Sequence, residues 1–291
     1  PELVSVIGRD KGLEKLRAGE MLFIDIETTG LSGGSGTFIF LVGAGFFTGE
    51  SFNIIQYFLR DYNEEPGLLF LLDELFRRFK TVVTFNGKCF DMQLIKTRFN
   101  LSRRHNHRLD ELFHLDLLHS SRRLWKSRLK NCGLKSIEES ILNTKRASED
   151  IPGELIPEIY FRYLKTKNPL PLKGVFYHNH HDILSLLFLL ITQLDLLDNP
   201  GVNKAIADYF SLARIYEKTG PSRICKEMYK KAMDNRVDFS RALFRLSLLC
   251  KRNSEWEEAV DCWNTLRDCR EYALFAREEL AKYFEHKRAM P

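Results

Sequence analysis

The chain has 291 residues, 44% of them hydrophobic, which is enough for a packed core and indicates one large domain or two of ordinary size. Its net charge of +5 is small: residues 1–200 carry 26 Lys and Arg against 25 Asp and Glu, and residues 201–291 carry 18 against 14. This balance excludes the strongly basic proteins that bind nucleic acid through net charge alone.

Cysteine usage and apolar runs bear on the compartment. The six cysteines form no Cys-x-x-Cys pair, so we expect reduced packing residues and a cytoplasmic location rather than a disulfide or zinc framework. The longest apolar stretches, 36–48 and 183–194, are shorter than the ~18 uncharged residues of a membrane span. We therefore expect no membrane partner.

The predicted elements follow the order three strands, helix, strand, helix, strand, and then helices. An apolar run from Met21 to Glu27 predicts a buried first strand. Later strands are predicted over 37–47, 51–59, 81–85 and 112–118, and helices over 65–79, 92–99, 120–130, 135–142, 154–164 and 183–197. The short connection at 48–50 makes the first three strands an antiparallel meander, and the proline-containing stretch 166–174 is expected to be a loop.

Four carboxylates lie at the ends of these elements. Asp25 and Glu27 alternate along the first strand and so share one face, where like charges repel unless a cation lies between them. Asp91 begins a helix after the Asn86-Gly87 turn. Asp182 precedes the helix 183–197, where it serves either as an N-cap or as a site residue.

These acids resemble the pattern of the DEDD nuclease superfamily, the DnaQ-like branch of the ribonuclease H-like fold. Longer segments resemble the YprB-type ribonuclease H-like family, and together they span roughly 19–197. The segments are Asp25–Thr37, Thr84–Asp91, Asp116–Lys126, Asp150–Gly153 and His178–Leu186. The resemblance implies an α/β domain over 1–198, with a mixed five-stranded sheet flanked by helices.

Carboxylate oxygens without a His or Cys ligand set suit Mg²⁺ or Mn²⁺ rather than zinc. Two such ions activate water and stabilise a leaving oxygen in phosphodiester hydrolysis. The resemblance implies that Asp25 bridges both ions, that Glu27 and Asp182 complete one, and that Asp91 helps to position the other.

The general base departs from the usual patterns. The superfamily carries either Tyr in Y-x3-D or His in H-x4-D, whereas here His178 and Tyr177 exchange these spacings relative to Asp182. We favour His178, because an imidazole accepts a proton near neutral pH. The neighbouring His180 and His181 are expected to be solvated residues at the start of the helix.

Three groups of residues are candidates for substrate binding. By resemblance, Thr28, Thr29 and Asn86 would line the site, although turn hydrogen bonding is an alternative for the threonines. The glycines of 32–36 are expected to form a turn beside the metals. The densest basic region is expected to track phosphates while Trp125 stacks on a base; it includes Arg103, Arg104, Arg108, Arg122, Arg123, Lys126, Arg128 and Lys130. A solvated helix face is the alternative.

Helical repeats are predicted after Asn199-Pro200-Gly201. Similar segments begin at Leu212, Leu246 and Leu280, at intervals of 34 residues. This spacing resembles tetratricopeptide repeats, so we expect an all-α domain over 199–291 with a possible protein partner. An irregular helical bundle is the alternative.

The leading hypothesis is a metal-dependent 3′-to-5′ exonuclease acting on single-stranded DNA or RNA. A non-catalytic adaptor that retains the fold and binds nucleic acid or protein through the repeats is the alternative from another class. A phosphodiesterase for small nucleotides is a third hypothesis.

Overall fold

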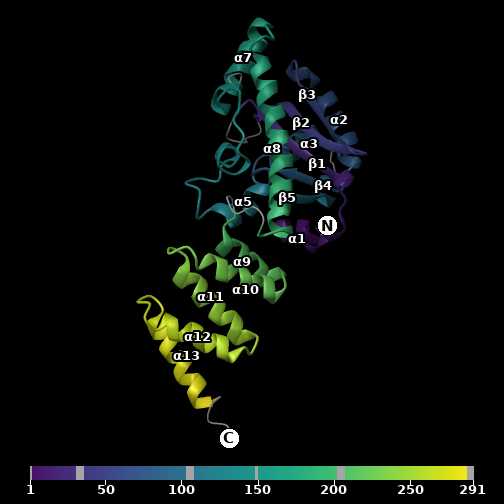
Figure 1. Cartoon of the computed structure of the whole chain (residues 1–291). Helices are drawn as coiled ribbons and strands as arrows, with labels where there is room; N and C mark the ends of the chain where they lie inside the picture. Colours follow the sequence, from purple (N-terminus) through teal and green to yellow (C-terminus); the bar gives the residue numbers. More distant parts are fainter. Residues whose placement is uncertain (1, 31–35, 103–107, 148–149, 202–206, 287–291) are drawn as a thin grey trace. The chain divides into compact units, whose positions relative to one another are not determined.

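The computed structural model describes residues 2–30, 36–102, 108–147, 150–201 and 207–286 (Figure 1). The expected glycine turn, apart from Gly36, and Arg103 and Arg104 of the basic region lie outside these ranges. The chain forms two compact units, Pro1–Arg122 with Leu129–Asp198, and Arg123–Arg128 with Asn199–Pro291.

The two units divide between Asp198 and Asn199. The first unit is interrupted by the segment Arg123–Arg128, which belongs to the second unit. Ser127 Oγ donates a hydrogen bond to the Asp208 carboxylate, and Arg128 Nη1 donates to Ala207 O at 3.1 Å. These bonds tie the segment to the second unit, a long-range pairing that residue spacing cannot show.

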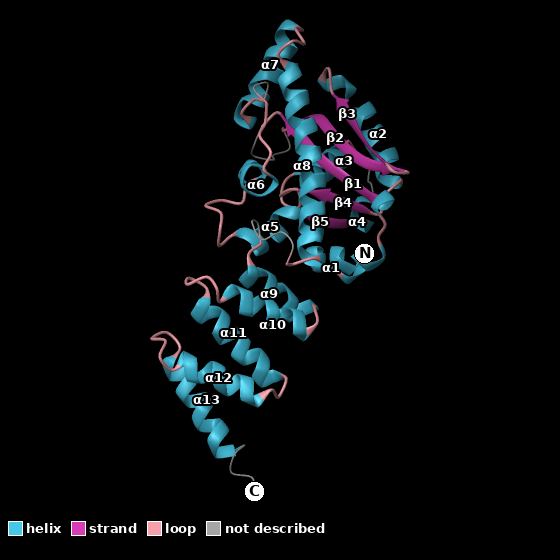
Figure 2. Ribbon diagram, in the orientation of Figure 1, coloured by secondary structure: helices cyan, strands magenta, loops and turns pink. Residues whose placement is uncertain are grey.

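The first unit is built on a five-stranded mixed sheet in the order β3-β2-β1-β4-β5 (Figure 2). The central strand β1 pairs antiparallel with β2 and parallel with β4, while β3 and β5 form the edges. The strands are β1 (Met21–Thr28), β2 (Ile39–Thr48), β3 (Ser51–Phe58), β4 (Thr81–Thr84) and β5 (Phe113–Asp116). The expected ribonuclease H-like sheet is confirmed.

Alternation along β1 separates its two faces. Leu22 and Ile24 are buried in the same hydrophobic core as the apolar residues of α2 and α3. Asp25 and Glu27 point to the opposite face, which α8 crosses (Figure 1). The acidic side chains therefore lie between the sheet and α8.

The helices of the first unit surround this sheet. They are α1 (Glu2–Gly8), α2 (Glu65–Arg77), α3 (Asp91–Leu101), α4 (Arg108–Glu111), α5 (Leu117–Trp125), α6 (Leu134–Ile137), α7 (Ile156–Thr166) and α8 (Leu172–Asp198). Shorter turns are 3-10 helices at Lys11–Lys15, Ala18–Glu20, Tyr62–Glu64 and Gly153–Leu155, and a π-helical turn at Glu138–Leu142.

The long helix α8 differs most from the sequence prediction. It begins at Leu172 rather than Ile183, so Asp182 and the histidines lie within the helix, and of the two alternatives for Asp182 the N-cap is wrong. The polar stretch Tyr177–Asp182 contains neither glycine nor proline, and Asn179 within it is fully buried against the sheet. Tertiary packing, which local periodicity does not report, extends the helix.

By length and composition α8 is also long and apolar enough to cross a membrane. Half of its most apolar window is buried inside the fold, as in the core helix of a soluble protein, so the membrane evidence is weak.

Two glycines of β2 bring α8 close to the sheet. A Cβ at Gly43 would lie 2.4 Å from Asn179 Oδ1, and a Cβ at Gly45 would lie 2.6 Å from Ile183 Cγ2. Real Cβ atoms do not approach other heavy atoms so closely, so this part of the helix reaches the sheet only because both positions lack a side chain.

The second unit is helical. Its helices are α9 (Tyr209–Thr219), α10 (Ser222–Ala232), α11 (Phe239–Arg252), α12 (Trp256–Leu266) and α13 (Ala273–His286). Leu212, Leu246 and Leu280 are all buried, as are Tyr229 and Trp263, which are also 34 residues apart. The tetratricopeptide-like character of these helices stays a prediction.

We predict that Gly45→Ala lowers the free energy of unfolding by about 1–3 kcal/mol, because the added methyl group overpacks the contact between β2 and α8. Urea denaturation measures this change. Gly19→Ala is the control, since a Cβ there meets nothing within 4 Å. Equal stability of both variants would contradict the close packing.

Candidate active site

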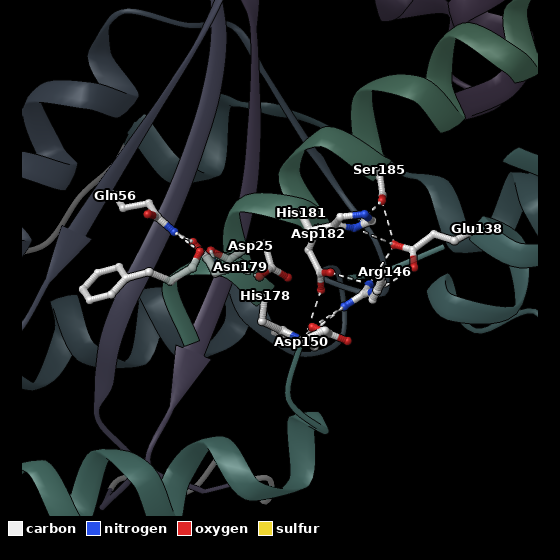
Figure 3. A network of polar contacts seen from close by, with 11 residues as sticks. Asp25, Gln56, Glu138, Arg146, Asp150, His178, Asn179, His181, Asp182 and Ser185 are labelled. Atoms are coloured by element: carbon white, nitrogen blue, oxygen red, sulfur yellow. Dashed lines mark hydrogen bonds and ion pairs between the residues drawn. The ribbon is translucent and has the colours of Figure 1, made fainter. Parts of the chain in front are cut away.

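Asp25 is held from α8 by a buried amide. Asn179 Nδ2 donates hydrogen bonds to Asp25 Oδ2 at 2.8 Å and to Asp25 O at 3.2 Å (Figure 3). Gln56 Nε2 on β3 donates to Asn179 Oδ1 at 2.9 Å, which fixes the orientation of the amide. These hydrogen bonds use Asp25 Oδ2 and leave the second carboxylate oxygen, Oδ1, outside the Gln56–Asn179–Asp25 series.

Asp91 reaches the site from the turn that follows β4. The Asp116 carboxylate at the end of β5 accepts from Asn86 N at 2.8 Å and from Lys88 N at 3.0 Å, and so holds this turn. Gly87 permits the approach, because a Cβ there would lie 2.7 Å from Asp91 Oδ2. The backbone of Ile26, between the two acids of β1, lowers the pKa of Asp91 and so opposes the larger effect of burial.

Asp182 is held by a buried arginine. Arg146 Nη2 donates to Asp182 Oδ1 at 2.5 Å, and the same guanidinium forms a bidentate pair with Glu138 at 2.7 Å for both bonds (Figure 3). Asp182 Oδ2 lies outside these bonds, 3.7 Å from His178 Nε2.

The four acids share one electrostatic environment. Burial, followed by the charges of Asp182, Glu27 and Asp91, raises the pKa of Asp25 well above its ordinary value. Burial and the charges of Asp182 and Asp91 do the same for the pKa of Glu27. Burial is also the main cause that raises the pKa of Asp91 to about 7, with a contribution from Asp116, and the main cause that raises the pKa of Asp182. The sequence-predicted acids therefore converge.

This donor set fits divalent cations. Half-buried carboxylates whose pKa values are raised by neighbouring carboxylates are stabilised by positive charge between them, and hard oxygen donors suit Mg²⁺ or Mn²⁺. No three of the four acids bring ligand atoms within 4.8 Å of one another, whereas two other groups of described residues do: Cys250 with Glu255 and Glu258, and Glu138 with His181 and Asp182. In the latter group, however, Arg146 and Ser185 already bind the Glu138 oxygens, so we interpret that group as an ion-pair network.

A family profile described as the RNase H superfamily matches residues 22–193. The chain belongs to the RNase H superfamily. It is also 36% identical over 286 residues to a protein of Bacillus subtilis (strain 168) described as uncharacterized protein YprB, a match that covers 96% of this chain and 67% of that protein.

A family B DNA polymerase from the archaeon Pyrobaculum calidifontis shows a distant structural likeness. The TM-score is 0.45 at 15% identity, and the match covers 73% of this chain but only 29% of the polymerase chain. This likeness is too remote to bear on function. Membership of the RNase H superfamily, together with the acidic cluster, supports a nuclease-like function that uses divalent metal ions and a nucleic acid substrate.

The two candidates for the general base lie in different surroundings in this RNase H superfamily site. His178 Nδ1 lies 2.8 Å from Asp150 Oδ1, and its Nε2 faces Asp182 (Figure 3). Tyr177 Oη instead accepts a hydrogen bond from Ala147 N at 3.2 Å. Of the two, His178 is the one whose free ring nitrogen faces an acid of the cluster.

The predicted substrate residues have mixed outcomes. Thr28 Oγ1 donates to Gly30 O at 2.8 Å, and Thr29 Oγ1 accepts from Phe38 N at 2.9 Å, so both hydroxyls make turn bonds at the end of β1. Asn86 has a left-handed φ of 63° in the turn before Asp91. Binding of substrate by these three residues stays a prediction.

The predicted basic ridge needs one correction. Trp125 is fully buried, so its ring is not available to stack on a base, and this expectation is wrong. The apolar face of α5 takes the ring into the core. Arg122 is exposed on α5, Arg123 is half-buried, and Lys126 is exposed in the turn after the helix ends.

Several site residues were not found from the sequence. Asn179, Asp116 and the Arg146–Glu138 pair hold the four acids in place, and Asp150 contacts His178. Asp116 and Asp150 stand in the segments that carry the family resemblance, which was the one available signal for them. Arg146 and Glu138 are far from the acids in sequence and gave none.

We predict that the metal-free protein loses stability as pH rises from about 5 to 7. Asp91 has an ordinary pKa of 3.8 and a folded-state pKa of about 7, so the folded state holds its proton more tightly and is favoured at lower pH. In EDTA, urea unfolding of Asp91→Asn should show a shallower decline across this range. An unchanged decline would contradict the assignment.

Proposed function

We propose that this protein is a metal-dependent nuclease that removes nucleotides from single-stranded DNA or RNA in the 3′-to-5′ direction. The observation that carries the proposal is the convergence of Asp25, Glu27, Asp91 and Asp182 from three separate elements, where the charge of Asp182 raises the pKa of each of the other three. Membership of the RNase H superfamily supports the reaction class, and the DEDD pattern of acids supports the exonuclease subclass.

The four acids would hold two Mg²⁺ or Mn²⁺ ions. When bound, such ions activate a water molecule and neutralise the charge of the scissile phosphodiester. The protein positions these acids before any substrate arrives, since Asn179 binds Asp25, Arg146 binds Asp182, and Asp116 holds the turn that leads to Asp91. Preorganised ligands of this kind avoid reorganisation during the reaction.

His178 would accept the proton of the attacking water. Its Nδ1 lies between Asp150 Oδ1 at 2.8 Å and Arg146 Nη1 at 3.1 Å. The Asp150 carboxylate only accepts, so the shorter contact assigns Nδ1–H as a donor to Asp150; Arg146 Nη1 is then a close charge neighbour rather than a donor to Nδ1, and the Nε2 lone pair is left toward Asp182. A neutral imidazole in this tautomer is a general base directed at the acidic cluster.

The substrate would approach past the end of β1 and the turn after β4. Thr28, Thr29 and Asn86 stand at these two places, and Arg122 and Lys126 offer exposed cations for phosphate contacts. The helical second unit would recruit a partner or guide the strand. A cytoplasmic location is part of the proposal, and four of the six cysteines are buried packing residues.

We predict that Asp25→Asn lowers the rate of Mn²⁺-dependent shortening of end-labelled single strands by at least about 100-fold. Loss of a residue that only supports a metal ligand lowers activity by about 10–100-fold, and loss of the ligand itself should lower it at least as much. Denaturing gels of labelled DNA and RNA over time give product length, substrate class and direction. Asp73→Asn, which breaks a surface pair with Arg77, is the control. Intact strands with the wild-type protein under every metal would favour the adaptor hypothesis.

We predict a loss of about 10²–10⁴-fold in kcat for His178→Gln, the range of general base catalysis. Tyr177→Phe should retain activity near that of the wild type, because the hydroxyl of Tyr177 accepts a hydrogen bond from the backbone N–H of Ala147. Single-turnover rates at saturating Mn²⁺ compare the two variants. Full activity of His178→Gln, or loss only in Tyr177→Phe, would assign the base elsewhere.

A further inference from the structure

The Arg146 side chain contacts four residues in and beside the acidic cluster, not only its ion-pair partner Glu138. Its guanidinium binds both oxygens of Glu138 and Asp182 Oδ1, and its Nη1 lies 3.1 Å from His178 Nδ1 and 3.5 Å from Asp150 Oδ1 (Figure 3). The side chain is only 8% exposed. One buried group thus contacts both the fourth acid and the proposed base.

The chain is shaped to deliver this arginine. Glu138 begins a π-helical turn that ends at Asn143 with a left-handed φ of 51°. Thr144 N then donates back to Glu138 O at 2.9 Å, which returns the chain toward Glu138 and places Arg146 beside it. π-helical turns are rare and often occur at functional sites.

Glu138 binds Arg146 and is not one of the four acids of the site. It is 1% exposed, and Ser185 Oγ on α8 donates to its Oε1 at 2.6 Å. Arg146 and Ser185 together occupy both Glu138 oxygens, so Glu138 ties the guanidinium to α8, one turn from Asp182. A planar guanidinium with a fixed fork of donors suits this task, whereas an ammonium group offers a point charge.

We propose that Arg146 is a positioning residue that turns Asp182 Oδ2 and His178 Nε2 toward the reacting phosphodiester, with Glu138 as its anchor. The proposal rests on the nuclease function proposed above. By binding Asp182 Oδ1, Arg146 leaves Oδ2 as the oxygen available to a cation. By lying against His178 Nδ1 beside Asp150, it helps to set the plane of the imidazole ring.

Charge alone predicts the opposite effect on cation binding. Arg146 is a positive group beside carboxylates, so its removal would tighten Mn²⁺ binding if electrostatic repulsion were its main influence. If it orients Asp182, its removal weakens binding, as the loss of an outer-shell partner does. The sign of the change in affinity separates the two roles.

The test uses the full chain and Mn²⁺ alone as the probe, with free Mn²⁺ followed by electron paramagnetic resonance. Arg146→Gln should weaken Mn²⁺ binding by about 10–100-fold, and Arg146→Lys should recover part of the loss. Arg98→Gln is the matched control, because the Arg98 side chain is as buried as that of Arg146 and forms a bidentate pair with Glu65, at 2.5 and 2.6 Å. Its Mn²⁺ dissociation constant should lie within about 2-fold of the wild-type value, a smaller change than the loss of one outer-shell partner causes.

Steady-state kinetics at saturating Mn²⁺ give a second readout. A positioning residue that does not touch substrate lowers kcat and leaves KM near the wild-type value. Unchanged or tighter Mn²⁺ binding in Arg146→Gln would overturn the proposal, as would a raised KM at constant kcat. Should Arg146→Gln fail to fold, Arg146→Lys and Glu138→Gln carry the same test. Failure of the wild type to bind Mn²⁺ would instead overturn the nuclease function itself.

Discussion

Repulsion between four half-buried carboxylates is the constraint on which the first unit depends. Like charges in a poorly solvated place raise one another's pKa and oppose ionisation, so the fold must supply compensating groups. It does so with the amide of Asn179 and the guanidinium of Arg146. These groups offset only part of the repulsion, and the remaining demand for positive charge is what a divalent cation satisfies.

The helix α8 organises much of this compensation. Asn179 and Asp182 are one turn apart on it, as are His178 and Asp182, so one rigid element sets the amide, the proposed base and the fourth acid. The bare backbone of Gly43 and Gly45 lets this element lie against β2. The geometry of the site is therefore a property of how a helix packs on a sheet, and changes in that packing would reach the chemistry.

The sequence was informative where local pattern and motif agreed. The five strands and the convergence of Asp25, Glu27, Asp91 and Asp182 followed from alternation and from the family resemblance. The start of α8 did not, because the polar residues before Ile183 are helical through contact with the sheet rather than through periodicity. The burial of Trp125 and the partnership of Arg146 with Asp182 are likewise long-range contacts that no spacing encodes. A basic and aromatic run therefore suggested a binding surface, whereas its aromatic residue belongs to the core.

The most direct test of the central claim is the location of the cation. Crystals of the protein soaked in MnCl₂, with anomalous diffraction recorded near the manganese edge, would place the ion without reference to activity. We predict anomalous density among the carboxylates of Asp25, Glu27, Asp91 and Asp182. Density confined to Glu138 and His181, or none at saturating Mn²⁺, would contradict the account.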